Sequence, residues 1–370
     1  MKILLLGEYS NVHATLAEGL KASGHKVTVV SNGDFWKDYP RDISLVRNSS
    51  SFLDGIRYII KLLFVLPRLR GYDIVQLINP MFLEIKAERI IYIYHYLRKH
   101  NKKMILCGYG MDWYWVNTCM TRKHLRYSDF NIGSNLRDTP DTRKEQQDWL
   151  RTPKELLNRF IARDCDGIIT GLYEYFVCYH PFFPKKTTFI PFPIKPSPTV
   201  HTDMISPDKV IFFIGINKSR NTYKGTDIML EALETLEKKY PERCKIIKAE
   251  SVPFNEYQHL MDYSDCILDQ LYSYTPAMNS LLAMSKGIIN IGGGEEENYL
   301  ILNEKELRPI INVQPNKYDV FIKLEQLVIH PEKIPELKRQ SVEYVCRHHD
   351  FMKVAGQYLD FYRNVFEDKI

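Results

Sequence analysis

The chain has 370 residues, 45% of them hydrophobic and 26% charged, with a formal net charge of +5 at pH 7. This length suffices for two domains with separate cores, and so mild a charge does not indicate nucleic acid as a partner. No run of about 18 uncharged apolar residues occurs, so we expect no transmembrane helix. Seven cysteines stand singly, without a C-x-x-C pair, which argues against a disulfide framework or zinc ribbon and favours the cytoplasm.

The first half of the chain alternates predicted strands and helices. Residues 2–6 form a continuous apolar run, typical of a parallel strand buried on both faces. Gly7 ends this run, Ser10 can cap the following helix, and Gly24 closes that helix before a strand at 26–30. The pattern continues with strands at 72–78, 103–107, 167–170 and 187–190, a helix at 86–99, and another helix that ends at 158–163.

A proline-rich connector separates this half from a second alternating series. Residues 191–207 contain five prolines, which stiffen the chain and exclude it from a sheet interior. Strands are predicted at 209–214, 244–248, 265–268 and 287–291. Helices are predicted at 226–239, with Thr226 as the N-cap, and throughout 334–366. The sequence therefore predicts an α/β protein with two doubly wound, Rossmann-like domains that face each other across a ligand-binding cleft.

Several segments resemble one known family when they are taken in order. They are MKILLLGEYS, GHKVTVV, YDIVQLINP, ILCGYGMDW, DCDGIITGLYE, FIPFP, FFIGINKSRNTYKGTDIMLEAL and SDCILDQLYSYTPAMNSLLAMSKGIINIGGG. Together they make the chain similar to GT-B glycosyltransferases of the glycogen-synthase-like, retaining group (glycosyltransferase group 1). This resemblance implies an acceptor domain at 1–193, a nucleotide-sugar donor domain at 194–351, and a last helix at 352–370 that packs back on the acceptor domain.

Residues 215–227 carry the most informative of these motifs. Two or three cations between a strand and a helix N-terminus can neutralise a diphosphate while the glycosidic bond to it breaks. The resemblance assigns phosphate binding to Lys224, and the family's arginine falls between Lys218 and Arg220. We favour Arg220, because its forked guanidinium matches phosphate oxygens; a solvated basic loop is the alternative.

Donor contacts are also implied for Asp269 and Gln270, which follow the strand at 265–268. The chain departs from the family motif here, because Leu282 and Tyr274 stand where the family has glutamates, one of which binds the donor ribose. A leucine cannot accept hydrogen bonds from ribose hydroxyls. Either other polar side chains nearby compensate, or donor binding is altered or lost. The candidates for compensation are Asn279, Ser280 and the carboxylates from Glu295 to Glu297.

Three consecutive glycines, Gly292, Gly293 and Gly294, directly precede Glu295 and Glu297. Such a turn allows backbone N–H groups to approach an oxyanion or a sugar closely, and the carboxylates suit sugar hydroxyls. The alternative is a tight turn into a helix whose acidic first turn complements its dipole.

Two loops of the first half complete the predicted site. Gly7, Glu8, Ser10 and His13 lie in or next to the first strand-to-helix loop. The resemblance implies that this loop approaches the donor phosphate and the acceptor, so we expect these residues to contact the acceptor. His13 can face the cleft or be a polar residue on the helix face. The single glycine of this loop is not a dinucleotide-binding fingerprint. Tyr109 and Asp112 follow the strand at 103–107; the resemblance places them beside the reacting sugar, although the family often has histidine at position 109.

Other features give weaker signals. The segment 57–70 is apolar with basic margins, typical either of a helix on an anionic membrane or of a core helix with snorkelling cations. Asp164 and Asp166 imitate a metal-binding motif, but their place between a helix and a strand argues against it. The adjacent His348 and His349 cannot both face one metal.

The sequence as a whole predicts a metal-independent glycosyltransferase without a cofactor. It would move a sugar from a nucleotide-diphosphate donor to a glycan or lipid-linked acceptor, with retention, in surface polysaccharide biosynthesis. We expect it in the cytoplasm, with contact to the inner face of the plasma membrane. The alternatives are a nucleotide-sugar epimerase of GT-B fold and a non-catalytic nucleotide- or sugar-binding partner; a nicotinamide oxidoreductase lacks its glycine fingerprint.

Overall fold

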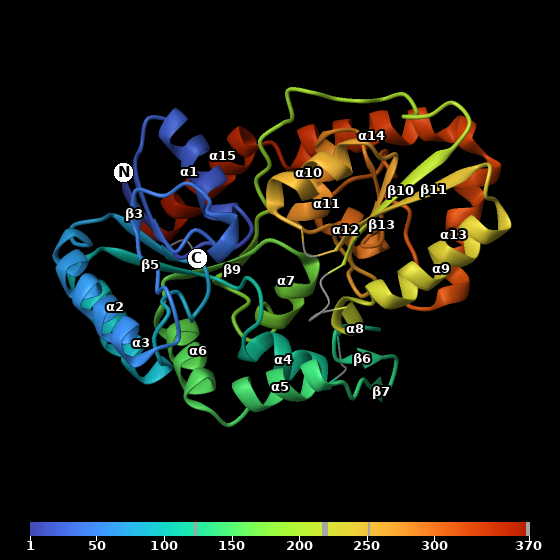
Figure 1. The fold of residues 1–370 in the computed structure, drawn as a ribbon. Helices are drawn as coiled ribbons and strands as arrows, with labels where there is room; N and C mark the ends of the chain where they lie inside the picture. The colour runs from blue at the N-terminus through green and yellow to red at the C-terminus, as the bar shows by residue number, and fades with distance from the viewer. Residues whose placement is uncertain (122–123, 217–220, 251, 368–370) are drawn as a thin grey trace.

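The computed structural model describes residues 1–121, 124–216, 221–250 and 252–367. Two lobes lie side by side (Figure 1), each built on a parallel sheet. The first sheet has the order β3-β2-β1-β4-β5-β8-β9 and the second the order β11-β10-β12-β13. The predicted fold class is therefore confirmed.

The strands of the first sheet are β1 (Lys2–Leu6), β2 (Lys26–Ser31), β3 (Ile43–Ser44), β4 (Ile74–Leu77), β5 (Lys103–Cys107), β8 (Gly167–Thr170) and β9 (Thr187–Phe189). Helices α1 (Val12–Ala22), α2 (Phe52–Val65), α3 (Ala87–His100), α4 (Trp113–Thr121), α5 (Pro140–Trp149), α6 (Pro153–Asp164) and α7 (Tyr173–Tyr179) accompany them, with short turns η1 (Phe35–Lys37) and η2 (Leu66–Arg68). A two-stranded antiparallel sheet, β6 (Asn131–Ile132) with β7 (Asn135–Leu136), lies between α4 and α5.

The second sheet consists of β10 (Val210–Ile216), β11 (Cys244–Glu250), β12 (Cys266–Leu268) and β13 (Ile289–Ile291). Its helices are α8 (Asn221–Lys224), α9 (Thr226–Lys239), α10 (Phe254–Asp262), α11 (Met278–Ser285), α12 (Glu296–Ile301), α13 (Lys317–Ile329) and α14 (Ile334–His348), with the short turn η3 (Pro331–Lys333). In the described part of the chain, no helix is both long and apolar enough to cross a membrane.

The last helix, α15 (Phe351–Phe366), lies against α1 of the first lobe (Figure 1). Gly19 permits this contact, since a Cβ there would lie 2.7 Å from the carbonyl oxygen of Phe351. The helix predicted over 334–366 is interrupted, because the chain passes between the lobes at this point. The N–H of Ile194 donates to His349 (2.7 Å), and the N–H of Phe351 donates to Ile194 (3.0 Å). The predicted domain limits stay predictions.

Two predicted helix caps are wrong by one residue. Helix α1 follows Asn11, whose φ is 71° and whose side chain makes no capping bond. Helix α9 follows Gly225 (φ 73°), so that Thr226 is its first residue. A Cβ on Gly225 would lie 2.7 Å from the side chain of Leu271. Positive φ and close packing therefore decide this second cap.

Candidate functional site

The first strand-to-helix loop lies where the first sheet reverses its strand order, because β1 pairs with β2 on one side and β4 on the other. Ligands of open α/β sheets bind at such points, beyond the carboxyl ends of the strands. A cavity of about 110 Å³ occurs here, lined among others by Glu8, Ser31, Phe35, Tyr58 and Glu84. It is a candidate ligand pocket.

Glu8 caps α1 from inside the protein. Its carboxylate accepts from the N–H of Ala14 (2.8 Å) and the N–H of His13 (3.3 Å). Burial raises the pKa of Glu8 to about 8, although these backbone bonds oppose the rise. Ser10 is half-buried in the loop, where its N–H donates to Asp34 at 2.9 Å.

His13 belongs to a buried network rather than to the cavity wall. Its Nδ1 lies 2.8 Å from the carbonyl oxygen of Gly7, which can only accept, so Nδ1 carries the proton. Its Nε2 then accepts from the amide of Gln76 (3.0 Å), whose oxygen accepts from the hydroxyl of Tyr362 in α15 (2.7 Å). Burial lowers the pKa of His13 to about 4. Both ring nitrogens are used, so the predicted contact with the acceptor is not supported.

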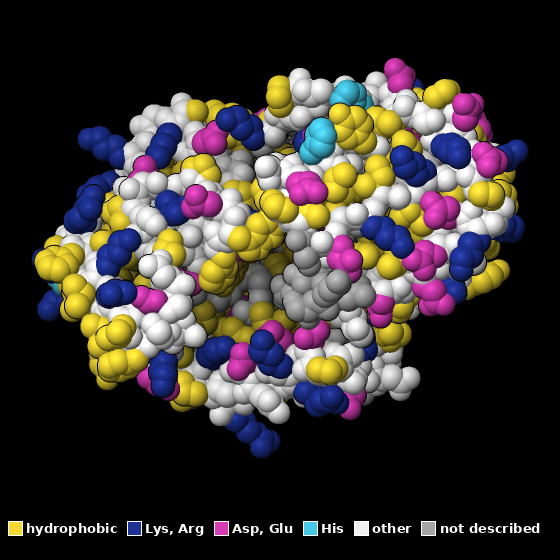
Figure 2. Space-filling view, viewed as in Figure 1, with side chains coloured by type: hydrophobic (Ala, Val, Ile, Leu, Met, Phe, Trp, Pro, Cys, Tyr) yellow, Lys and Arg dark blue, Asp and Glu magenta, His cyan; other side chains and the backbone are white. Residues whose placement is uncertain are grey.

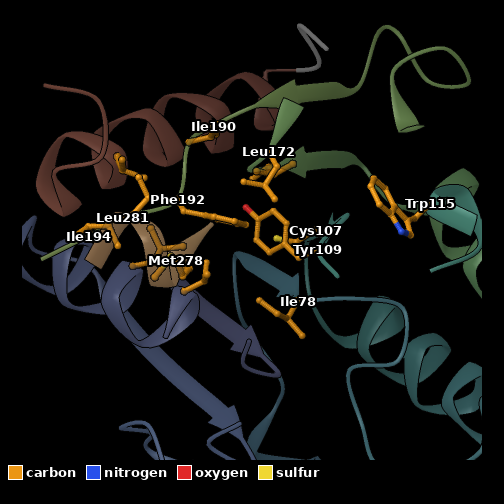
Figure 3. Close-up of a cluster of buried hydrophobic side chains, with 14 of the residues drawn as sticks. Ile78, Cys107, Tyr109, Trp115, Leu172, Ile190, Phe192, Ile194, Met278 and Leu281 are labelled. Atoms are coloured by element: carbon orange, nitrogen blue, oxygen red, sulfur yellow. The ribbon is translucent and has the colours of Figure 1, made fainter. Parts of the chain in front are cut away.

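Tyr109 also faces the core. Its ring packs edge-on to Phe192, as Figure 3 shows, and its hydroxyl lies 2.5 Å from that of Tyr358 in α15. Asp112 is buried as well, where it accepts from the N–H of Trp115 (2.8 Å) and from the hydroxyl of Tyr179. Burial raises the pKa of Asp112 to about 6. Neither side chain presents an atom to a sugar, so we do not retain their predicted catalytic roles.

The second lobe brings several predicted donor contacts together. Lys224 follows β10 and Asp269 follows β12; the Lys224 Nζ lies 3.4 Å from a carboxylate oxygen of Asp269. The hydroxyl of Ser280 donates to the other oxygen at 3.3 Å, and the amide of Asn279 donates to the hydroxyl of Tyr257 at 2.8 Å. The side chain of Lys224 is 31% exposed, so the cation remains accessible. Three related predictions stay predictions. Gln270 is half-buried, and Lys218 and Arg220 lie outside the described residues.

The glycine turn packs against protein rather than opening toward a ligand. Gly292, Gly293 and Gly294 are all buried. A Cβ on Gly292 would lie 2.5 Å from the carbonyl oxygen of Gln270, and one on Gly293 would lie 2.9 Å from the Oγ of Ser273. Close packing against the 270–275 loop thus accounts for these two glycines, and the predicted donor contact is not supported.

The carboxylates after this turn bind residues of the first lobe. Glu295 accepts from the hydroxyl of Tyr127 (2.6 Å), from Arg126 (2.8 Å) and from Gln314 (2.8 Å). Burial favours the neutral acid, but hydrogen bonds from Asn312, Tyr127 and Gln314 and the charge of Arg126 outweigh it and lower the pKa of Glu295. The guanidinium of Arg126 also pairs with Glu297. The sequence carried no motif that pointed to Arg126 or Tyr127.

The two departures from the family motif have structural uses. The ring of Tyr274 stacks on Tyr127 with 4.7 Å between centroids, and its hydroxyl accepts from the N–H of Tyr127 at 3.1 Å. Leu282 packs against a small hydrophobic cluster of the second lobe. Apolar and aromatic packing thus replaces ligand contacts at these positions.

The remaining polar motifs also have protein partners. Asp166 pairs with Arg98, Asp164 accepts from the hydroxyl of Tyr94 (2.7 Å), His348 binds Glu304, and His349 binds the carbonyl oxygen of Phe192. Among the residues that the structure describes, no three His, Cys, Asp or Glu side chains converge as metal ligands.

Comparison with known proteins supports the fold assignment. No protein-family model and no curated protein sequence matches the chain. Solved structures do: sucrose-phosphate synthase from Thermosynechococcus elongatus has a TM-score of 0.64 at 13% identity, with 100% of both chains covered. HepE from Anabaena in complex with UDP-glucose has a TM-score of 0.59 at 11% identity (97% of this chain, 98% of HepE). WaaG, a glycosyltransferase involved in lipopolysaccharide biosynthesis, has a TM-score of 0.58 at 13% identity (98% and 99%). The chain therefore has the GT-B fold.

Proposed function

We propose that the chain is a glycosyltransferase that moves a sugar from a nucleotide diphosphate to a glycan or lipid-linked acceptor. The observation that carries this proposal is the position of Lys224, an accessible cation beside Asp269 at the carboxyl ends of β10 and β12. Ligands of parallel sheets bind at that edge. Further support comes from similar structures, because HepE was solved with UDP-glucose and WaaG is a glycosyltransferase.

In the proposed reaction, Lys224 and Arg220 stabilise the departing nucleoside diphosphate. The bond between the anomeric carbon and the phosphate oxygen breaks, and the acceptor hydroxyl oxygen forms the new bond to that carbon. The acceptor hydroxyl attacks the face from which the diphosphate leaves, so the configuration of the sugar is retained. Its proton passes to the departing phosphate, so no protein base is needed. Fixed cations stabilise charge where it develops in the transition state, and on this account no metal ion is required.

The finer setting is part of the same proposal. The enzyme acts in the cytoplasm, in surface polysaccharide biosynthesis, and touches the anionic inner face of the plasma membrane through α2. Phe52 and Phe64 of that helix are 80% and 78% exposed, and Arg57 and Lys61 lie on the same helix. Figure 2 shows apolar and basic side chains mixed at this edge of the molecule. Exposed apolar side chains flanked by cations are typical of helices that lie on anionic lipid.

A second candidate function is a non-catalytic nucleotide- or sugar-binding partner. It is favoured by one observation: Glu295 already binds Tyr127, Arg126 and Gln314. Such a carboxylate is not available to a donor ribose. The two candidates differ in whether a bound nucleotide sugar is broken down.

A thermal-shift screen against UDP, GDP, TDP and their sugars, with and without EDTA, tests the donor site. We expect a rise in melting temperature for one diphosphate that EDTA leaves unchanged and the double variant Arg220→Ala, Lys224→Ala abolishes. Lys209→Ala is the matched control, because Lys209 lies at the opposite end of β10 beside Glu242. A flat response across the whole panel would contradict the proposal.

A further inference from the structure

The segment 125–137 connects the two lobes at the donor edge. It lies between α4 and α5 of the first lobe and contains the β6–β7 sheet. Figure 1 shows β6 and β7 next to α8 of the second lobe. Its partners there are α8, which follows β10, the loop after β12, and Glu295 after β13. The carboxyl ends of β10 and β12 form the proposed donor site. One segment therefore contacts both the residues that lead into Lys224 and the loop that follows Asp269.

Arg137 holds the backbone that leads into Lys224. One guanidinium nitrogen donates to the carbonyl oxygen of Thr222 at 2.6 Å. The other donates to the carbonyl oxygens of Asp129, in the same segment, at 2.9 Å and of Tyr223 at 3.4 Å. The same guanidinium lies 3.8 Å from the ring centroid of Tyr272. A planar fork with several donors suits this combination of three carbonyls and an aromatic face. On the other side, the carbonyl of Lys224 accepts from the N–H of Leu271 at 3.0 Å.

The other end of the segment holds the loops after β12 and β13. Tyr127 donates through its N–H to Tyr274 and through its hydroxyl to Glu295. Arg126 pairs with Glu297 and lies 5.0 Å from the ring centroid of Tyr274. These contacts place α12 and the 272–275 loop relative to the first lobe.

We propose that the segment 125–137 is a positioning element of the donor site, in which Arg137 fixes the backbone that presents Lys224 to the diphosphate. This inference rests on the proposed function and names the first-lobe residue on which diphosphate affinity depends. A cation that is fixed before binding loses less conformational entropy when the ligand arrives. Donor affinity is therefore coupled to the contact between the lobes, because Arg137 comes from one lobe and Lys224 from the other.

Three variants separate positioning from general stability. Arg137→Ala removes the two carbonyl contacts to α8 and the one to Asp129. Arg137→Lys keeps the charge but loses the planar fork. Arg143→Ala is the control, because Arg143 lies nearby on α5 and its guanidinium pairs with the exposed carboxylate of Asp138. Two readouts are measured on the full chain: UDP affinity by calorimetry, and amide hydrogen exchange of the ligand-free protein in the peptide that covers 221–226.

We expect Arg137→Ala and Arg137→Lys to weaken UDP binding about tenfold or more, as small misplacements of binding groups do. Both variants should also speed exchange at 221–226, whereas Arg143→Ala should change neither readout. UDP affinity and exchange that match wild type in Arg137→Ala would overturn the inference. If the wild-type protein binds no nucleoside diphosphate, the proposed function fails. In that case, exchange at 221–226 still tests the positioning role of Arg137. Faster exchange in Arg137→Ala would support that role, and unchanged exchange would refute it.

Discussion

The ion pair between Arg126 and Glu297 offers a quantitative test of the contact between the lobes. Arg126→Ala removes a two-pronged pair with Glu297, one hydrogen bond to Glu295 and the approach to the ring of Tyr274. The side chain of Arg126 is 55% exposed, so water screens the pair. An exposed ion pair contributes about 0.2–1 kcal/mol to the free energy of unfolding. A hydrogen bond to a charged group that is shielded from water contributes about 1.5–3 kcal/mol.

Glu295 keeps its bonds to Tyr127 and Gln314 in that variant, so no buried carboxylate is left unpaired. We therefore expect Arg126→Ala to lower the free energy of unfolding by about 1–2 kcal/mol, between the two limits above. Glu297 is one of two acidic partners of Arg126. Glu297→Ala should therefore lower the free energy of unfolding by less than Arg126→Ala does.

A double-mutant cycle in urea measures how far the two residues depend on each other. We expect a coupling energy of about 0.5–1 kcal/mol between Arg126 and Glu297, smaller at high salt. Arg143→Ala with Glu297→Ala serves as the reference pair and should be additive. Additivity of Arg126→Ala and Glu297→Ala within about 0.3 kcal/mol would refute the claim that this pair joins the lobes.

Three further substitutions test buried polar groups by urea unfolding. The pKa of Glu8 rises from 4.5 to about 8 on folding. Because the folded state then binds one more proton than the unfolded state, stability falls as the pH increases from 4.5 to 8. Glu8→Gln should remove that fall, and an unchanged dependence of stability on pH would contradict the assignment. Lys338→Met should lower the free energy of unfolding by about 3–5 kcal/mol, since the buried Asp265 loses its cation at 2.8 Å and keeps the N–H donors of Ile205 and Ile211. A loss below about 1 kcal/mol would count against this. Tyr362→Phe should cost about 1–2 kcal/mol, because Gln76 loses its donor, and an unchanged midpoint would contradict the network.

The strands were predictable because buried parallel strands are continuous apolar runs, a local property of the sequence. β1, for example, spans the predicted residues, and β5 does so too. The helix caps were less predictable. Asn11 and Gly225 adopt positive φ, and a sequence pattern that seeks a side-chain cap selects the neighbouring hydroxyl instead.

The site was predictable in part, for a related reason. Cations and carboxylates after parallel strands meet at one edge of a sheet, and Lys224 and Asp269 do so. The direction of a side chain depends on partners that are distant in the sequence. Tyr109 turns to Tyr358, and Glu295 is bound by Tyr127; neither partner belongs to a motif.

The most direct test of the account follows the fate of a nucleotide sugar by phosphorus NMR. The protein is incubated with the nucleotide sugar whose diphosphate it binds, together with glycan and lipid-linked acceptors. We predict that the diphosphate is released as the sugar appears on one acceptor, that Lys224→Ala abolishes release, and that Lys209→Ala does not. A nucleotide sugar that binds at the Lys224 site but stays intact with every acceptor would contradict the account and establish a non-catalytic binding partner.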